Sequence, residues 1–391
     1  MNLVREGRIA TIDGLRGIAV LLVVWYHVWQ VTWQSAVVPF VNVSLQPLAE
    51  TGWLGVELFF FISGFVLMLP LVQAHLSGTE PPTWRHFYAR RFLKIVPSYV
   101  LCIAVMLAIG YQTYAHGWEA ARDIAFHLAF IHNWFAVTHG SINGVMWSLG
   151  VEIQFYVLFP LLAIAFVRSP LLVTVAMFVV ANAWRIWALL ANHYFLAQRE
   201  AQLPAYLDLF AAGMLCAYGY VYLALKRPRI AQRHWFFSAL TIGGLIAFWL
   251  LATDCYAIAH NQPDWPEPWK VQHRSLVALA ISAVALGSLF AARWLRLVLA
   301  NRVLLFLAAI SYNLYLWHLP ITRELLAHRL TPYVGADPHD DHVWQLASWF
   351  VFIPVSIAIS ALLTYGFEQP ILRWRRRQPR AIVPAAAPDP V

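Results

Sequence analysis

The most constraining feature of this chain is a succession of apolar runs, each roughly 20 residues long, that occupies most of its length. A helix rises about 1.5 Å per residue, so a run of this length can cross the hydrocarbon core of a bilayer. Only 12% of the 391 residues are charged and 61% are hydrophobic. Soluble domains average about 25% charged residues. The sequence therefore predicts an all-α integral membrane protein.

We predict about ten transmembrane helices arranged around a central polar cavity. A further stretch, residues 123–139, is apolar but short, and it is interrupted by His127, His132 and Asn133. We expect it to form a short re-entrant or interfacial helix, since irregular backbone at membrane depth needs protein or water around it. The predicted spans lie near residues 12–34, 52–73, 93–112, 145–167, 170–190, 205–225, 235–253, 274–292, 303–325 and 344–367.

The distribution of basic residues favours ten spans over eleven. Lys and Arg are retained preferentially in the cytoplasmic loops of membrane proteins. With ten spans and a cytoplasmic N-terminus, the outer segments hold only Arg122, Arg199, Lys270, Arg274, Arg323 and Arg329. We therefore predict a multi-pass inner-membrane protein with both termini in the cytoplasm. Residues 1–372 are the predicted transmembrane domain, and 373–391 are a tail that is first basic and then rich in Pro and Ala.

Several other kinds of protein are disfavoured by the same sequence. The net charge of +8 does not indicate a nucleic-acid partner, because the basic residues form no stripe with interleaved aromatic residues. The three cysteines are scattered and offer neither a disulfide framework nor the paired spacing of a metal site. The outer segment 337–342 combines histidines with aspartates, but we interpret it as a solvated acidic loop and predict no metal site.

Five ionisable residues occur inside predicted spans at a similar depth, nearer the outer face. A charged group within the bilayer costs at least a few kcal/mol, so such residues are functional candidates. The alternative is structural, since polar side chains also join helices within the membrane. For His318, which is flanked by apolar residues and followed by Pro320, the structural role fits at least as well. The five residues are His27, Glu57, Glu152, Arg185 and His318.

The first span also aligns a cation with a histidine. Arg16 and His27 are eleven residues apart, close to three helical turns, so they share a face about 16 Å apart along the axis. Arg91 and Lys94, at the start of the third span, share a face at i and i+3. Together with Arg16 they predict a cationic mouth for a phosphate-bearing ligand. The basic cluster at 90–94 equally fits a topology signal or contact with lipid headgroups.

Five segments occur in an order that resembles the motifs of a known family. They are residues 11–19 (TIDGLRGIA) followed by His27, 55–65 (GVELFFFISGF), 90–97 (RRFLKIVP), 147–156 (WSLGVEIQFY) and 311–318 (SYNLYLWH). These segments are similar to motifs of the membrane acyltransferase-3 family of bacterial O-acyltransferases. The resemblance runs in order from about residue 9 to 372, which is essentially the whole chain.

The resemblance implies acyl transfer from a cytoplasmic acyl-CoA, usually acetyl-CoA as co-substrate, to an extracytoplasmic glycan or glycolipid. It assigns Arg16 and His27 to the family's first-helix pair, and Arg91 and Lys94 to its basic pair in the third helix. Two positions depart from the family pattern. Lys94 stands where arginine is more common and loses the bidentate geometry of a guanidinium. Glu57 replaces an aspartate common there.

These residues lead to a catalytic hypothesis. Arg16, Arg91 and Lys94 bind the CoA phosphates, and His27 acts as general base on an acceptor hydroxyl. Glu152 orients His27, with Glu57 as the alternate partner. An acyl-histidine relay fits the sequence equally well. The rival hypothesis is a non-enzymatic transporter or flippase for a lipid-linked or anionic solute, because intramembrane charges also mark transport pathways. The sequence specifies neither the acceptor, the acyl chain length nor the oligomeric state.

Overall fold

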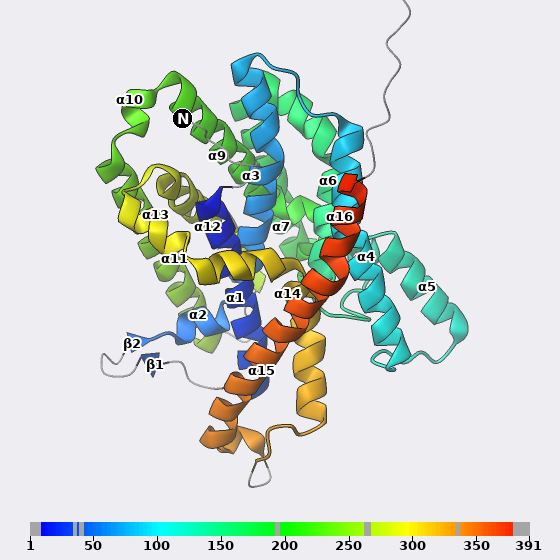
Figure 1. Cartoon of the computed structure of the whole chain (residues 1–391). Helices are drawn as coiled ribbons and strands as arrows, with labels where there is room; N and C mark the ends of the chain where they lie inside the picture. The colour runs from blue at the N-terminus through cyan, green and yellow to red at the C-terminus, as the bar shows by residue number, and fades with distance from the viewer. Residues whose placement is uncertain are drawn as a thin grey trace, which may run out of the picture.

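The computed structural model shows an almost entirely helical molecule (Figure 1). The structure describes residues 9–33, 37–38, 43–191, 196–261, 267–333 and 337–377. Within these ranges ten helical segments are long and apolar enough to cross a membrane, which confirms the predicted fold class and number of spans. The long helices are α1 (Ala10–Thr32), α3 (Leu54–Ser77), α4 (Trp84–Ala108), α6 (Trp147–Arg168), α7 (Pro170–Ala191), α9 (Leu207–Lys226), α11 (His234–Asn261), α12 (Glu267–Phe290), α14 (Arg302–Ala327) and α15 (His342–Leu363).

Short elements connect and extend these helices. The only paired strands in the described part of the chain, β1 and β2, are two residues long and antiparallel, with Val38 opposite Val43. The tenth span continues from α15 through a π-helical turn, η5, into α16. The short elements are β1 (Val37–Val38), β2 (Val43–Ser44), α2 (Gln46–Glu50), α5 (Gly117–Leu128), η1 (His132–Trp134), α8 (Leu196–Glu200), η3 (Leu203–Tyr206), α10 (Pro228–Ala231), α13 (Arg293–Leu299), η4 (Pro338–Asp340), η5 (Thr364–Glu368) and α16 (Gln369–Arg377).

Helix α1 lies at the centre of the bundle, packed between α3 and α14. Glycines allow this close packing. A Cβ atom on Gly17 would overlap the main-chain carbonyl of Leu304 near the start of α14, and one on Gly55 of α3 would overlap the carbonyl of Ala19. The backbones therefore approach more closely than larger side chains would permit, as at other helix contacts in membranes. This packing fixes the position of α1 and of the polar side chains that it carries.

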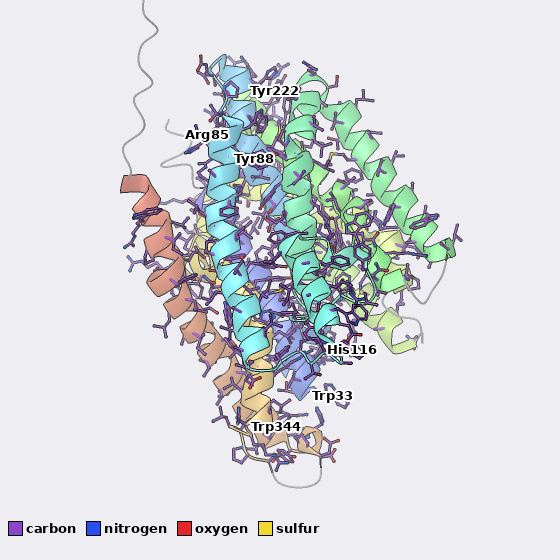
Figure 2. The ribbon with its side chains drawn as sticks, turned by 90° about the vertical axis from the view of Figure 1, so that its right-hand side faces the viewer. Trp33, Arg85, Tyr88, His116, Tyr222 and Trp344 are labelled. Atoms are coloured by element: carbon purple, nitrogen blue, oxygen red, sulfur yellow. The ribbon has the colours of Figure 1, made fainter. Side chains whose placement is uncertain are left out.

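The two ends of the bundle carry different parts of the site. Arg85, at the start of α4, lies near one end together with Tyr222, whereas Trp33 and Trp344 lie near the opposite end (Figure 2). Because Trp33 directly follows α1, Arg16 belongs to the half of α1 nearer Arg85. His27 belongs to the half nearer Trp33.

The stretch predicted as a re-entrant or interfacial helix, 123–139, forms α5 and η1, neither of which is a candidate span. The helix starts earlier than predicted and ends at Leu128, since Phe130 has a φ of 56°, in the left-handed region. The rings of His127 and His132 are buried and stacked, with centroids 4.0 Å apart, and Asp123 accepts from His127 at 3.0 Å. Burial lowers the pKa of His132 to about 3.

The predicted boundary of the tail at residue 373 falls inside a helix. Helix α16 continues to Arg377, so the first five residues of the predicted tail are helical. The remainder of the predicted tail, 378–391, lies outside the described residues.

Candidate active site

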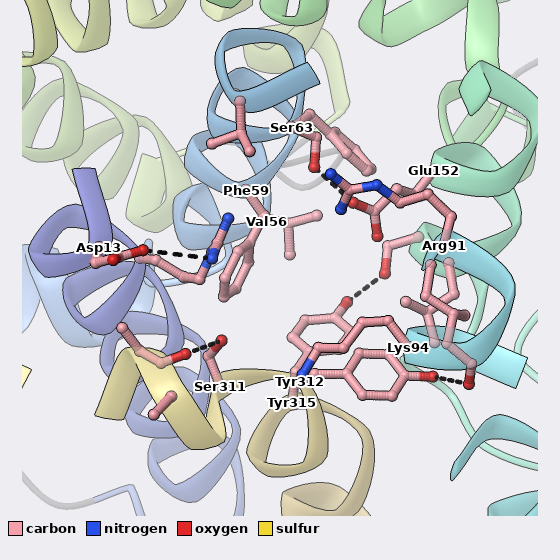
Figure 3. A pocket seen from close by; sticks show the side chains of 18 of the residues that line it. Asp13, Val56, Phe59, Ser63, Arg91, Lys94, Glu152, Ser311, Tyr312 and Tyr315 are labelled. Atoms are coloured by element: carbon pink, nitrogen blue, oxygen red, sulfur yellow. Dashed lines mark hydrogen bonds and ion pairs between the residues drawn. The ribbon is translucent and has the colours of Figure 1, made fainter. Parts of the chain in front are cut away.

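A cavity of about 210 Å³ lies among α1, α3, α4, α6 and α14. Helices far apart in the sequence contribute its polar side chains, with Asp13 on one side and Arg91 and Glu152 on the other (Figure 3). The apolar part of the wall includes Val56 and Phe59 of α3. The polar lining consists of Asp13, Arg16, Ser63, Arg91, Lys94, Ser148, Glu152, Tyr156, Ser311, Tyr312 and Tyr315.

The three predicted phosphate-binding residues all line this cavity. Arg16 is held by Asp13, one helical turn earlier on α1, with 3.6 Å between the nearest charged atoms. The Arg91 guanidinium lies 5.4 Å from the centroid of the Tyr156 ring, within cation–π range. The predicted convergence of Arg16, Arg91 and Lys94 is therefore present in the structure, although their role in binding remains a prediction.

Lys94 pairs with a carboxylate that the sequence analysis did not select. Its ammonium group pairs with Glu368 of η5 and lies 5.5 Å from the centroid of the Tyr312 ring. The second oxygen of Glu368 accepts a 2.9 Å hydrogen bond from Asn313, which also donates to Thr364 at 2.9 Å. Glu368 is nearly buried, whereas the Lys94 side chain is 35% exposed. A carboxylate at the end of an apolar run was the available signal for this residue.

Glu152 lies in the cavity wall, but it does not contact His27. Its carboxylate accepts hydrogen bonds from the hydroxyls of Ser63, at 2.5 Å, and Tyr156. The predicted pairing of Glu152 with His27 is therefore wrong. The two residues were predicted at a similar depth, but the side chain of Glu152 lines the cavity beside Ser63 and Arg91 (Figure 3). Any catalytic role of Glu152 would be exerted from the cavity.

Glu57, the alternate partner of His27, is also bound elsewhere. Its carboxylate accepts a 2.8 Å hydrogen bond from Arg274 of α12, and both side chains are almost completely buried. Arg274 also lies 3.9 Å from Glu200 and 4.4 Å from the centroid of the Tyr206 ring. The predicted alternate pairing with His27 is wrong, because α3 turns Glu57 toward α12 and not toward α1.

His27 instead contacts His318 of α14. His318 Nε2 lies 2.9 Å from His27 Nδ1, and the ring centroids are 4.9 Å apart. Each Nδ1 also lies near the carbonyl four residues earlier in its own helix, at 3.0 Å for Val23 and 2.9 Å for Leu314. His318 is buried and His27 is half-buried. Sequence reasoning named His318 as one of five ionisable groups but did not select it as a site residue.

The predicted layer of five ionisable residues thus divides into separate groups. Only His27 and His318 are joined directly. Arg185 donates a 2.8 Å hydrogen bond to Asp208 of α9 and a 2.9 Å bond to Ser275 of α12. Both members of this ion pair are fully buried. We attribute the difference to helix rotation, which the depth of a residue does not specify.

Tyr315 connects the cavity to the histidine pair. It lines the cavity, shares a 2.6 Å hydrogen bond with Ser148, and packs edge-on against Phe59 with centroids 5.7 Å apart. On the same helix its ring centroid is 6.1 Å from that of His318. Tyr315 and His318 are three residues apart and so share a face of α14, a spacing present in the sequence but not used in the prediction. The cavity wall therefore adjoins the histidine pair through Tyr315.

Pro320 explains how α14 is anchored beside His318. Proline has no N–H, so the carbonyl of Leu316, four residues earlier, has no helical donor. Asn143, which is buried, donates a 2.8 Å hydrogen bond to that carbonyl. This bond ties α14, at a point two residues before His318, to the segment that precedes α6.

Comparison with known proteins gives a consistent set of relatives. A family model described as an acyltransferase domain matches residues 9–365. O-acetyltransferase OatA of Staphylococcus aureus is 25% identical over 328 residues, which cover 79% of this chain and 50% of that protein. Peptidoglycan O-acetyltransferase OatA of Listeria monocytogenes is 24% identical over 339 residues, which cover 80% of this chain and 49% of that protein. The chain therefore spans about half the length of these relatives. No solved structure matches.

Proposed function

The chain belongs to the acyltransferase family whose model matches residues 9–365, and on this basis we propose that it transfers an acyl group from acyl-CoA to a glycan hydroxyl. Acetyl is the proposed group and acetyl-CoA the proposed co-substrate, because two relatives carry the name O-acetyltransferase. The proposed acceptor is an extracytoplasmic glycan or glycolipid. The Listeria relative is named for peptidoglycan, which makes peptidoglycan the first acceptor to test.

One arrangement carries this proposal: a single cavity holds Arg16, Arg91 and Lys94, and its wall at Tyr315 adjoins the histidine pair. Arginine and lysine are the usual ligands of phosphate groups. The cavity, at about 210 Å³, is smaller than the roughly 300–1,000 Å³ pockets that enclose whole drug-sized ligands. It therefore suits the thin acyl-pantetheine arm of acyl-CoA, while the nucleotide and its phosphates stay at the mouth.

We assign the cavity mouth to the cytoplasmic side of the bacterial inner membrane, with both termini there. The support is the excess of basic residues in the segments at that end, as the positive-inside rule requires. His27 then lies toward the outer face, about 16 Å farther along α1 than Arg16. Donor and acceptor would approach the reacting atoms from opposite sides of the membrane.

The proposed chemistry uses His27 as a general base. The imidazole takes the proton of the acceptor hydroxyl as its oxygen attacks the thioester carbonyl. The tetrahedral intermediate then expels the CoA thiolate, which receives the proton from the imidazolium. One C–O bond forms, one C–S bond breaks, and the base returns to its starting state. Incubating the protein with labelled acetyl-CoA and no acceptor separates this route from a covalent one, since an acyl-histidine would retain the label.

A test with purified protein in lipid separates binding from transfer. Wild type should bind acetyl-CoA and acetylate soluble peptidoglycan fragments. His27→Ala should keep the binding and lose transfer by at least about 100-fold, which is typical of the loss of a general base. Arg91→Ala should weaken binding of acetyl-CoA. Dephospho-acetyl-CoA lacks the 3′-phosphate of CoA. The loss of affinity caused by Arg91→Ala should therefore be smaller for this ligand than for acetyl-CoA.

Arg85→Ala is the matched control. Arg85 also lies at the start of α4 and is exposed, but it is not part of the cavity wall. Equal acetyl-CoA affinity in wild type, Arg85→Ala and Arg91→Ala would remove the docking role of the cavity. Wild-type protein that transfers no acetyl group to any member of a glycan panel would remove the proposed function.

A further inference from the structure

We propose that His318 is the positioning residue of His27. It accepts a hydrogen bond from His27 Nδ1–H and thereby keeps His27 Nε2 unprotonated, so that this nitrogen can receive the proton of the acceptor hydroxyl. The inference rests on the proposed function, since it explains how the proposed base is held in a productive state. It follows from the hydrogen-bonding capacity of the four ring nitrogens of His27 and His318.

The protonation of His318 is set by its own helix. A carbonyl oxygen can only accept a hydrogen bond, so the 2.9 Å contact between His318 Nδ1 and Leu314 requires a proton on Nδ1. In a neutral imidazole the other nitrogen then carries the lone pair. His318 Nε2 is therefore an acceptor, and it is the atom that faces His27 at 2.9 Å.

The same argument applied to His27 gives a consistent result. The carbonyl of Val23 lies 3.0 Å from His27 Nδ1 and also requires a proton there. This single N–H is directed at two acceptors, Val23 and His318 Nε2. A second proton on His318 would place two N–H groups against each other across 2.9 Å, so the contact excludes an imidazolium at His318. Both rings thus carry their proton on Nδ1.

This assignment leaves His27 Nε2 as the free base of the pair. Tyr26 packs edge-on against the His27 ring, with centroids 5.1 Å apart. Within the described residues the hydrogen bonds of the ring go only to Val23 and His318, both through Nδ1. A base whose other nitrogen is fixed by a hydrogen bond is held in one tautomer and one orientation, as in the catalytic triads of hydrolases.

The partner helix is well placed to hold this geometry. The hydrogen bond from Asn143 to the carbonyl of Leu316 anchors α14 next to His318. Gly17 allows α1 to contact Leu304 of α14 closely. His318 itself is fully buried. When His27 takes up a proton, His318 Nε2 continues to accept from Nδ1–H and stabilises the imidazolium without a charge of its own.

Two substitutions of similar size separate a positioning role from simple packing. His318→Gln can keep an acceptor oxygen close to the position of Nε2, whereas His318→Met fills the space without one. We expect kcat for acetyl transfer to fall about 10- to 100-fold in His318→Met, the loss typical of residues that orient metal-bound histidines. His318→Gln should recover most of the rate. The KM for acetyl-CoA should stay within about twofold of wild type in both, because the cations of the cavity are unchanged.

Several outcomes would overturn the proposal. His318→Met with wild-type kcat removes the role outright, and an equal loss in the Gln and Met variants assigns His318 to packing. If neither variant folds, as judged by acetyl-CoA binding, nitrogen-15 NMR of histidine-labelled wild type decides. The His27 signals, identified by their absence in His27→Ala, should show a protonated Nδ1 and an unprotonated Nε2. The opposite tautomer would refute the assignment.

Failure of this inference is distinguishable from failure of the proposed function. Active wild type, inactive His27→Ala and fully active His318→Met would leave the acyltransferase proposal standing and remove only the positioning role. Full transfer by His27→Ala would instead remove the proposed base, and the role of His318 with it.

Discussion

Replacing Arg274 by methionine tests whether Glu57 holds helices together or takes part in acyl transfer. Arg274 Nε and Glu57 Oε1 are 2.8 Å apart and join α12 to α3. The two side chains are only 1% and 2% exposed, so water cannot replace either partner. The Arg274 guanidinium also lies 3.9 Å from Glu200 and over the Tyr206 ring. Its loss would leave two buried carboxylates without this cation.

The magnitude follows from the burial of the pair. Removing one partner of a buried ion pair costs about 3–5 kcal/mol, because the remaining charge stays uncompensated. We therefore expect Arg274→Met to lower the free energy of unfolding by about 3–5 kcal/mol. Adding Glu57→Leu removes the second charge, so the double variant should lose less than the sum of the single changes. The coupling energy between directly bonded residues should be on the order of 1–3 kcal/mol.

Unfolding in mixed micelles, followed by tryptophan fluorescence, measures these free energies. Arg229→Met is the control, because Arg229 is exposed and should change stability by no more than about 0.5 kcal/mol. Acetyl-CoA binding and transfer are then measured under conditions in which each variant is folded. Glu57→Gln should retain transfer there, since Glu57 contacts Arg274 and is not part of the cavity wall. Unchanged stability in Arg274→Met, or loss of transfer in fully folded Glu57→Gln, would refute this reasoning.

Three further predictions concern other charged and titratable groups. Glu368→Gln removes the charge that pairs with Lys94 and should tighten acetyl-CoA binding about 3- to 10-fold in equilibrium titrations; weaker binding would mean that Glu368 positions Lys94. If Glu152 takes part in transfer from the cavity wall, Tyr156→Phe, which removes one of its two hydroxyl donors, should slow transfer on the order of 10- to 100-fold with acetyl-CoA affinity preserved. Unaffected transfer would remove Glu152 from the chemistry. The pKa of His132 is about 3 in the folded protein and about 6.5 when unfolded, so stability should be complete above pH 6.5 and fall by about 2 kcal/mol at pH 5. Hydrogen exchange of residues 117–134 should show this loss, and His132→Asn should abolish it.

The fold and the cationic part of the site follow from properties that a single sequence states directly. The length of an apolar run and the excess of basic residues on one side are local features, and they predicted ten spans. Arg16 lies on α1, and Arg91 and Lys94 share one face of α4 near its start. The positive-inside rule places the start of α1 and the start of α4 on the same side of the membrane. The side chains of Arg16, Arg91 and Lys94 therefore lie toward the same end of the bundle. The cavity confirms that convergence.

The partners of the buried carboxylates were not predictable in the same way. Depth along a helix follows from the rise per residue, but the direction of a side chain depends on the rotation of its helix and on which helices are neighbours. Glu57 and Glu152 were predicted at similar depths, but Glu57 bonds to Arg274 of α12 and Glu152 to Ser63 of α3. Arg274 was also misjudged. We predicted that its span begins at residue 274 and counted it among the outer basic residues, whereas α12 begins at Glu267 and buries it about two turns inside.

The separation of carboxylates from the histidine pair has a chemical consequence. A carboxylate beside His27 would raise its basicity strongly, but it would also place an anion on the proposed acyl-CoA path, away from the cations Arg16 and Lys94. In the structure Glu152 lines the cavity with the cations, and His27 contacts the imidazole of His318, which we infer to be neutral. A neutral partner can orient the base without adding charge to the hydrocarbon interior, where each charge costs at least a few kcal/mol. In the proposed mechanism, positive charge develops at His27 only during the reaction. The hydrogen bond from its Nδ1–H to His318 would then stabilise the transition state more than the resting state.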